Sequence, residues 1–126
     1  TSAVRVAQNG PELVQDIFEQ TGIRVEVIPG DREAELIARG IRQAVLLGPA
    51  PHLLMDIGGG SVEFILANGT DIFWKQSFEI GAQRLLDRFF TQDPLPAAQV
   101  QAEQAYLAEV LAPLTAAVQQ YRPVGL

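Results

Sequence analysis

The chain has 126 residues, of which 48% are hydrophobic and 19% are charged, and this composition supports a folded core rather than a disordered segment. The formal net charge of −6 argues against a general binder of nucleic acids or membrane surfaces, because either would need a basic face. Cysteine is absent and His52 is the single histidine, so the sequence excludes disulfides, thiolate zinc sites and histidine-rich metal sites.

No apolar run approaches the ~20 residues that a membrane-spanning helix needs, and no signal peptide opens the chain. We therefore expect a cytoplasmic protein. The chain starts without a methionine and ends at YRPVGL, so we also expect it to be part of a longer protein.

The first half of the chain predicts two helices with a strand between them. In chain order it has a mixed stretch over 1–9, a helix over 10–22, a strand over 23–29 and a helix over about 32–47. In the mixed stretch Val4 and Val6 alternate. Gly22 suits the residue that stops the first helix, and Asp31 is a good N-cap for the second.

The second half predicts three strands followed by helices. In chain order it has a loop over 48–52, strands over about 53–57, 62–67 and 71–79, a helix that opens at Gly81 and a helical segment over about 97–121. Asn68-Gly69 favours a type I′ hairpin between the last two strands. Pro113 should kink or divide the last helix. This order favours an α/β layered domain with a mixed sheet flanked by helices, in which the 48–52 loop joins two subdomains.

Three consecutive glycines and a serine, Gly58 to Ser61, follow the first strand of the second half. Glycines allow a positive φ and let backbone amides face outward, so such a run can bind an anion, most often phosphate. It is neither a Walker loop nor a dinucleotide-binding loop, because the lysine and the following helix are missing. Without further support, a plain hairpin turn explains it equally well.

Two acidic residues flank this turn. If the turn occupies residues 58–61, Asp56 lies opposite Glu63 on one face of the sheet, with Cβ atoms ~5 Å apart. Two such carboxylates would repel, and an Mg²⁺ ion bound beside substrate phosphates would relieve that repulsion. The alternative is that one of the two acids is exposed or protonated.

Glu33 is a third acidic residue, in the first turn of the helix over about 32–47. A glutamate near a phosphate can orient or deprotonate an attacking water, although a first-turn glutamate is usually only a helix-start residue. Arg5 could bind phosphate with both guanidinium nitrogens, or it could be a solvated surface residue. The residues alone leave both alternatives open.

Three ordered motifs carry a resemblance to a known family. The segment from TSAVR to GDREAELIARGI, the motif LLMDIGGGSVEF and the segment EIGAQRLLDRF are similar to those of the exopolyphosphatase / guanosine pentaphosphate phosphohydrolase (Ppx/GppA) family. The resemblance covers nearly the whole chain. Val62 stands where the family often has threonine, and Arg32 where it often has an acid.

The resemblance implies a ribonuclease H-like, actin-like ATPase fold, with residues 1–50 ending the first subdomain and residues 51–126 beginning the second. It implies that Glu33 is the catalytic base and that Asp56 and Glu63 bind Mg²⁺. The residues that it assigns to phosphate binding are Gly58, Gly59, Gly60, Ser61 and, less strongly, Arg5.

The function implied is an Mg²⁺-dependent hydrolase that releases terminal phosphate from inorganic polyphosphate, guanosine pentaphosphate or both. No nucleic acid or membrane partner is expected, and a homodimer of the full-length protein stays open. The family's N-terminal phosphate loop and later glycine motif are not in this chain, so we expect the 126 residues alone to hydrolyse little or nothing. The alternatives are an ATP-binding kinase or assembly protein of the same superfold, and a sensor that binds such a ligand without hydrolysing it.

Overall fold

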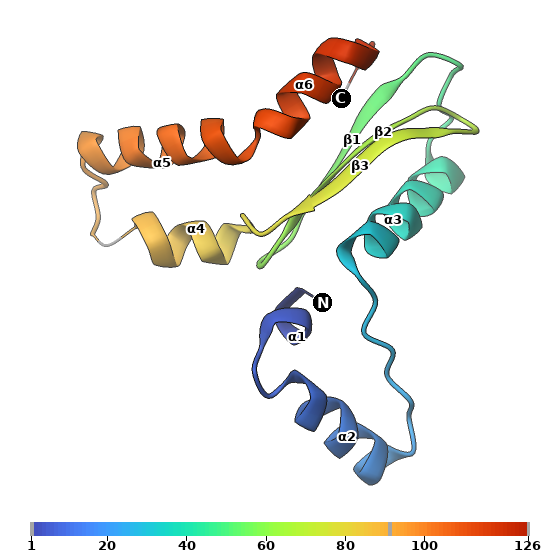
Figure 1. The fold of residues 1–126 in the computed structure, drawn as a ribbon, viewed down its shortest axis with the longest axis vertical. Coiled ribbons are helices and arrows are strands. Elements are labelled where there is room, and N and C mark those ends of the chain that lie inside the picture. The colour runs from blue at the N-terminus through green and yellow to red at the C-terminus, as the bar shows by residue number, and fades with distance from the viewer. Residues whose placement is uncertain (1, 91, 126) are drawn as a thin grey trace.

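A three-stranded sheet lies between one helix on one face and a group of helices on the other (Figure 1). The computed structural model of the chain describes residues 2–90 and 92–125. The helices are α1 (Ser2–Val6), α2 (Gly10–Thr21), α3 (Gly30–Ala44), α4 (Ala82–Phe89), α5 (Ala97–Val110) and α6 (Ala112–Tyr121). The strands are β1 (His52–Ile57), β2 (Val62–Ala67) and β3 (Ile72–Phe78).

The sheet has the order β1-β2-β3, and both strand pairs are antiparallel. The mixed pairing that we expected is therefore not seen among the residues that the structure describes. The predicted register is confirmed, because Asp56 pairs with Glu63 and Ile57 with Val62. Between β2 and β3 the register shifts at Leu66 and Ala67.

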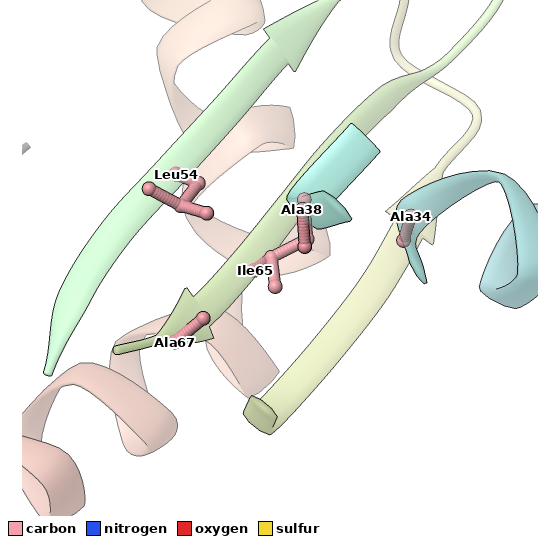
Figure 2. Close-up of a cluster of buried hydrophobic side chains, with 5 residues drawn as sticks. All are labelled: Ala34, Ala38, Leu54, Ile65 and Ala67. Atoms are coloured by element: carbon pink, nitrogen blue, oxygen red, sulfur yellow. The ribbon is translucent and has the colours of Figure 1, made fainter. Parts of the chain in front are cut away.

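The two faces of the sheet carry separate apolar clusters, because successive side chains of a strand point to opposite faces. On the α3 face, Ala34 and Ala38 pack against Leu54, Ile65 and Ala67 (Figure 2). The two alanines allow α3 to lie close to the strands, and Ile65 is fully buried beneath it. Burying a side chain of this size contributes about 1.5–3 kcal/mol.

The opposite face of the sheet is covered by the C-terminal helices. Its buried residues are Val62, Phe64, Phe78, Ile80 and Leu114. Partly buried side chains of α5 and α6 pack around them. Because both faces are covered, every residue of β2 is buried.

Three predicted helix boundaries are confirmed. Gly22 ends α2 in the left-handed conformation, with a φ of 72°. Gly81 is the N-cap of α4. Pro113 lies in the first turn of α6, so the predicted segment 97–121 is divided into α5 and α6.

The start of α3 differs from the prediction. The helix begins at Gly30 with Pro29 as its N-cap, and no side chain caps it, so Asp31 lies in the first turn instead. The Pro29 carbonyl accepts hydrogen bonds from the amides of Arg32 and Glu33 at 3.0 and 3.1 Å. An acidic residue in the first turn still interacts favourably with the helix dipole.

The predicted strand over 23–29 is wrong, because this segment has no regular secondary structure. A strand needs a hydrogen-bonded neighbour, and no described strand lies beside this segment; Val25 and Val27 are accordingly 39% and 45% exposed. The mixed stretch at the start of the chain contains helix α1, which the alternation of Val4 and Val6 did not indicate.

The type I′ turn predicted at Asn68-Gly69 is also wrong, because neither residue has a positive φ. Instead, the Asn68 side chain accepts hydrogen bonds from the amides of Thr70 and Asp71 at 2.9 and 2.6 Å. Arg42 of α3 donates to the carbonyls of Asn68 and Asp71 at 2.9 and 2.7 Å. The C-terminal end of α3 is thus attached to the turn between β2 and β3.

Helix α3 belongs to the predicted first subdomain, yet it packs on the sheet of the predicted second one. The division into residues 1–50 and 51–126 stays a prediction. Among the described residues, no helix combines the length and the apolar character that crossing a bilayer would require.

Candidate active site

A row of polar side chains crosses the sheet at the end where β1 and β2 are joined. Asp56, Glu63 and Ser77 occupy directly opposed positions on β1, β2 and β3, on the face that α3 covers. Glu63 is 1% exposed and accepts a hydrogen bond from the Ser77 hydroxyl at 2.7 Å. Asp56 is exposed. One acid of the predicted pair is therefore buried with a hydrogen-bond donor, and the other faces solvent.

The N-terminal end of α3 packs on this row. A Cβ atom at Gly30 would lie 2.6 Å from the Ser77 Cβ, so only glycine permits this contact. The contact brings Glu33, in the first turn of α3, to the same end of the sheet. Gly30 thus allows α3 to approach the sheet, and this approach places Glu33 at the site.

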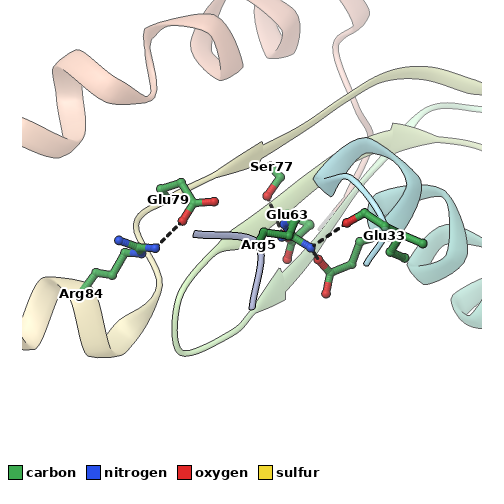
Figure 3. Close-up of polar contacts among 7 residues, drawn as sticks. Arg5, Glu33, Glu63, Ser77, Glu79 and Arg84 are labelled. Atoms are coloured by element: carbon green, nitrogen blue, oxygen red, sulfur yellow. Dashed lines mark hydrogen bonds and ion pairs between the residues drawn. The ribbon is translucent and has the colours of Figure 1, made fainter. Parts of the chain in front are cut away.

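Arg5 holds the Glu33 carboxylate (Figure 3). Its Nη1 lies 2.6 Å from Glu33 Oε2 and 3.4 Å from the carbonyl oxygen of Ile28. The Arg5 side chain is 14% exposed, and its buried Nη2 has no hydrogen-bond partner among the described residues. Arg5 therefore fixes the orientation of Glu33 from α1, and one of its donors stays available.

The glycine turn is bonded to the start of α4 through its carbonyl groups. The Ala82 amide donates to the Gly58 carbonyl at 3.0 Å, and the Gln83 amide donates to the Gly59 carbonyl at 2.9 Å. The Gly81 amide donates to the Gly60 carbonyl at 3.2 Å. These contacts also satisfy amides at the start of α4 that have no partner within the helix.

The direction of the carbonyls fixes the direction of the amides. In a planar trans peptide the C=O and the following N–H point in opposite directions. Because the carbonyls of the three glycines face α4, the amides of Gly59, Gly60 and Ser61 face away from its start. In the described part of the chain, the Gly59 and Gly60 amides donate to no protein acceptor. They are available to an anion.

The glycines are required for a different reason from the one that we predicted. None of Gly58, Gly59 and Gly60 has a positive φ. Instead, neighbouring atoms approach closely, since a Cβ at Gly60 would lie 2.1 Å from the Ser2 hydroxyl oxygen. A Cβ at Gly81 would lie 2.4 Å from the Gly59 carbonyl carbon. The turn is therefore enclosed by α1 on one side and by the start of α4 on the other.

One open cavity of about 720 Å³ joins these groups. The predicted site residues that line it are Glu33, Asp56, Gly58, Gly59, Gly60, Ser61 and Glu63. Ser2, Gln83, Arg84 and Asp87 also line it, and the sequence reasoning did not single them out. Arg5 lines a neighbouring cavity of about 400 Å³ instead. The structure thus brings every predicted site residue except Arg5 to one cavity. Arg5 contacts Glu33 but lines the neighbouring cavity.

The residues present fit a hard cation such as Mg²⁺ in the chemistry of their donors. Asp56 and Glu63 supply carboxylate oxygens, which Mg²⁺ prefers. Among residues 2–90 and 92–125 no group of three or more acidic or histidine side chains is placed to hold a metal. A bound Mg²⁺ would therefore need water and substrate oxygens to complete its coordination, as is usual for this ion.

Another acid on α3, Glu35, holds the helix to the sheet. Its carboxylate pairs with Lys75 of β3 and, at 2.8 Å, with Arg32. The hydrogen bond from Lys75, followed by the one from Arg32, lowers the pKa of Glu35 from 4.5 to about 2. These contacts reinforce the placement of Glu33 two residues earlier on the same helix.

The chain is similar to known proteins in sequence and in structure. The model of the Ppx/GppA phosphatase family matches residues 1–123. An exopolyphosphatase of known structure from Cytophaga hutchinsonii is 50% identical, with a TM-score of 0.93 over 98% of this chain and 41% of that chain. The PPX-GPPA enzyme of Aquifex aeolicus is 27% identical, with a TM-score of 0.72 over 89% of this chain and 37% of that chain.

A curated relative is the bifunctional 3-dehydroquinate synthase/phosphatase of Fusobacterium nucleatum, which is 35% identical over 96 residues. That match covers 75% of this chain and 14% of the relative, so the chain spans less than half the length of each protein that it is compared with here. The expected actin-like fold is confirmed, because the structural neighbours are Ppx/GppA proteins with that fold. The chain belongs to the Ppx/GppA phosphatase family.

Proposed function

We propose that the protein carrying this chain is a phosphoanhydride hydrolase that releases terminal phosphate from inorganic polyphosphate, from guanosine pentaphosphate, or from both. The observation that carries the proposal is the convergence of Glu33, Asp56, Glu63 and the glycine turn on one cavity. The resemblance of the chain to an exopolyphosphatase over 98% of its length supports the substrate class.

The glycine turn binds the terminal phosphate in this mechanism. Its outward amides donate to phosphate oxygens and stabilise the charge that develops on them during transfer. They do so without reorganising, because the carbonyls on the other side of the same peptides are fixed by α4. The turn is thus a rigid group of donors rather than a flexible loop.

Glu33 orients a water molecule for in-line attack and accepts its proton. Arg5 keeps the carboxylate in place through Oε2, which leaves Oε1 for the water. When bound, Mg²⁺ would neutralise phosphate charge, and Asp56 and Glu63 are the residues that would hold it. The cavity needs such a cation, because four acids line it: Glu33, Asp56, Glu63 and Asp87.

The test is phosphate release by the full-length protein that carries this chain, with polyphosphate, guanosine pentaphosphate and ATP as substrates. Glu33→Gln removes the proton acceptor and is expected to lower kcat by at least about 100-fold. Glu12→Gln is the matched control, since Glu12 also lies in the first turn of a helix but is exposed and outside the cavity. The control should keep wild-type turnover.

Wild-type turnover by Glu33→Gln would refute the assignment of the base. A clear preference for ATP over inorganic polyphosphate and guanosine pentaphosphate would favour the alternative function, an ATP-binding kinase or assembly protein of the same fold.

A further inference from the structure

Arg84 of α4 contacts the glycine turn directly. Its Nε donates to the carbonyl oxygen of Gly60 at 2.8 Å. Its Nη2 lies 2.7 Å from the Glu79 carboxylate, just after the end of β3 (Figure 3). One guanidinium group therefore connects the turn between β1 and β2 with the segment that leads from β3 into α4.

The charge around the cavity makes this side chain unusual. Arg84 is the one lysine or arginine among the described residues that line the cavity, whose lining also includes the four acids named above. A cation placed only to bind the substrate would leave all its donors free. Arg84 instead uses two of its three nitrogens on protein acceptors.

We propose that Arg84 is a positioning residue that fixes the Gly60–Ser61 peptide for phosphate binding; this inference rests on the proposed function. The Gly60 carbonyl accepts from both the Gly81 amide and Arg84, so its two lone pairs are used. Since the Ser61 amide belongs to the same planar peptide, fixing the carbonyl also fixes this donor. The bond from Arg84 is charge-assisted, which makes it the stronger of the two.

Lysine cannot replace Arg84 in this position. The guanidinium is a planar fork that reaches Gly60 and Glu79 at the same time, whereas an ammonium group is a point charge on a flexible stem. Arg84→Lys should therefore retain the charge of the cavity and lose the fixed direction of the peptide. This difference separates positioning from simple charge attraction.

The experiment measures binding of tripolyphosphate with Mg²⁺ by calorimetry, and kcat and KM on polyphosphate, in the full-length protein. Arg84→Gln is expected to weaken tripolyphosphate binding and to raise KM by about tenfold, because a charge-assisted hydrogen bond supports the site. We expect kcat to fall as well, because the Ser61 amide on this peptide would also stabilise the charge that develops on the phosphate during transfer. Arg84→Lys should recover only part of the lost affinity.

Arg88→Gln is the matched control, because it removes an arginine one turn later on α4. Arg88 stacks on Tyr106, with its Cζ 3.9 Å from the ring centroid, and does not line the cavity. This variant should bind tripolyphosphate as the wild type does. If Arg84→Gln and Arg88→Gln weaken binding equally, or if Arg84→Lys restores it fully, the positioning inference is wrong.

The two proposals fail in different ways. If the wild-type protein binds no tripolyphosphate and releases no phosphate, the proposed function is refuted. If the wild type binds and hydrolyses polyphosphate while Arg84→Gln does so with unchanged affinity and KM, only the inference about Arg84 is refuted.

Discussion

Replacing Gly81 by alanine tests the close packing of α4 against the glycine turn. The new Cβ would lie 2.4 Å from the Gly59 carbonyl carbon and 2.5 Å from both the Gly59 oxygen and the Gly60 carbonyl carbon. Carbon atoms in ordinary contact are about 3.5–4.0 Å apart, so the backbones must separate by roughly 1 Å. Alanine can adopt the backbone angles of Gly81, a φ of −59° and a ψ of 159°, so the contact alone causes the cost.

Overpacking of this kind costs about 1–3 kcal/mol, and we expect the upper part of that range because the contacted atoms are backbone. In a protein of a few hundred residues this corresponds to a melting temperature about 4–12 °C lower. Circular dichroism of the full-length protein measures the shift. The separation also moves the turn, so tripolyphosphate should bind less tightly to the variant.

Gly40→Ala is the control with the opposite expected sign. Gly40 lies inside α3 and is exposed, and a Cβ atom there would meet no described atom within 4 Å outside the backbone of its own helix. Alanine in a helix interior is more stable than glycine by about 0.5–1 kcal/mol, so this variant should melt slightly higher than the wild type. A melting temperature of Gly81→Ala equal to or above that of the wild type would refute the reasoning from close contact.

Two further predictions concern pH and metal. Because the folded-state pKa of Glu35 is lowered from 4.5 to about 2, its ion pairs stabilise the fold fully above about pH 4.5, and this contribution is lost as the pH falls towards 2. The difference in melting temperature between the wild type and Glu35→Gln should therefore be constant at neutral pH and vanish near pH 2; a difference that persisted there would contradict it. Chelation of Mg²⁺ should abolish phosphate release and added Mg²⁺ restore it, and Asp56→Asn should raise the Mg²⁺ concentration required by at least about tenfold. Full activity of the chelated enzyme would contradict the metal assignment.

The parts of the fold that were predicted correctly depend on local patterns. The three strands follow from alternating or continuous apolar runs, and the pairing of Asp56 with Glu63 follows because the length of a turn sets the register of a hairpin. Gly22 and Pro113 act through their own backbone geometry, so a local pattern is enough to predict them. The glycine turn and its two acids were therefore placed correctly from the sequence.

The parts that could not be predicted depend on irregular or distant contacts. Counting residues across the turn from the pair Ala67 and Ile72 would place Gln76 opposite Glu63, but the register shift places Ser77 there. The contact of Arg84 with Gly60 joins residues 24 positions apart, and no local pattern marks it. The partner of Arg5 is likewise 28 residues away, so the sequence suggested phosphate where the structure has Glu33.

Helix α3 is attached along its whole length. Gly30 abuts Ser77 at one end, Glu35 is paired with Lys75, and Arg42 bonds the turn after β2 near the other end. The 15 residues of the helix are about 22 Å long. Glu33 therefore lies on a helix that contacts the sheet, or the turn after β2, near both of its ends. In the proposed reaction the substrate therefore has to be brought to Glu33, because the helix that carries this glutamate is held to the sheet.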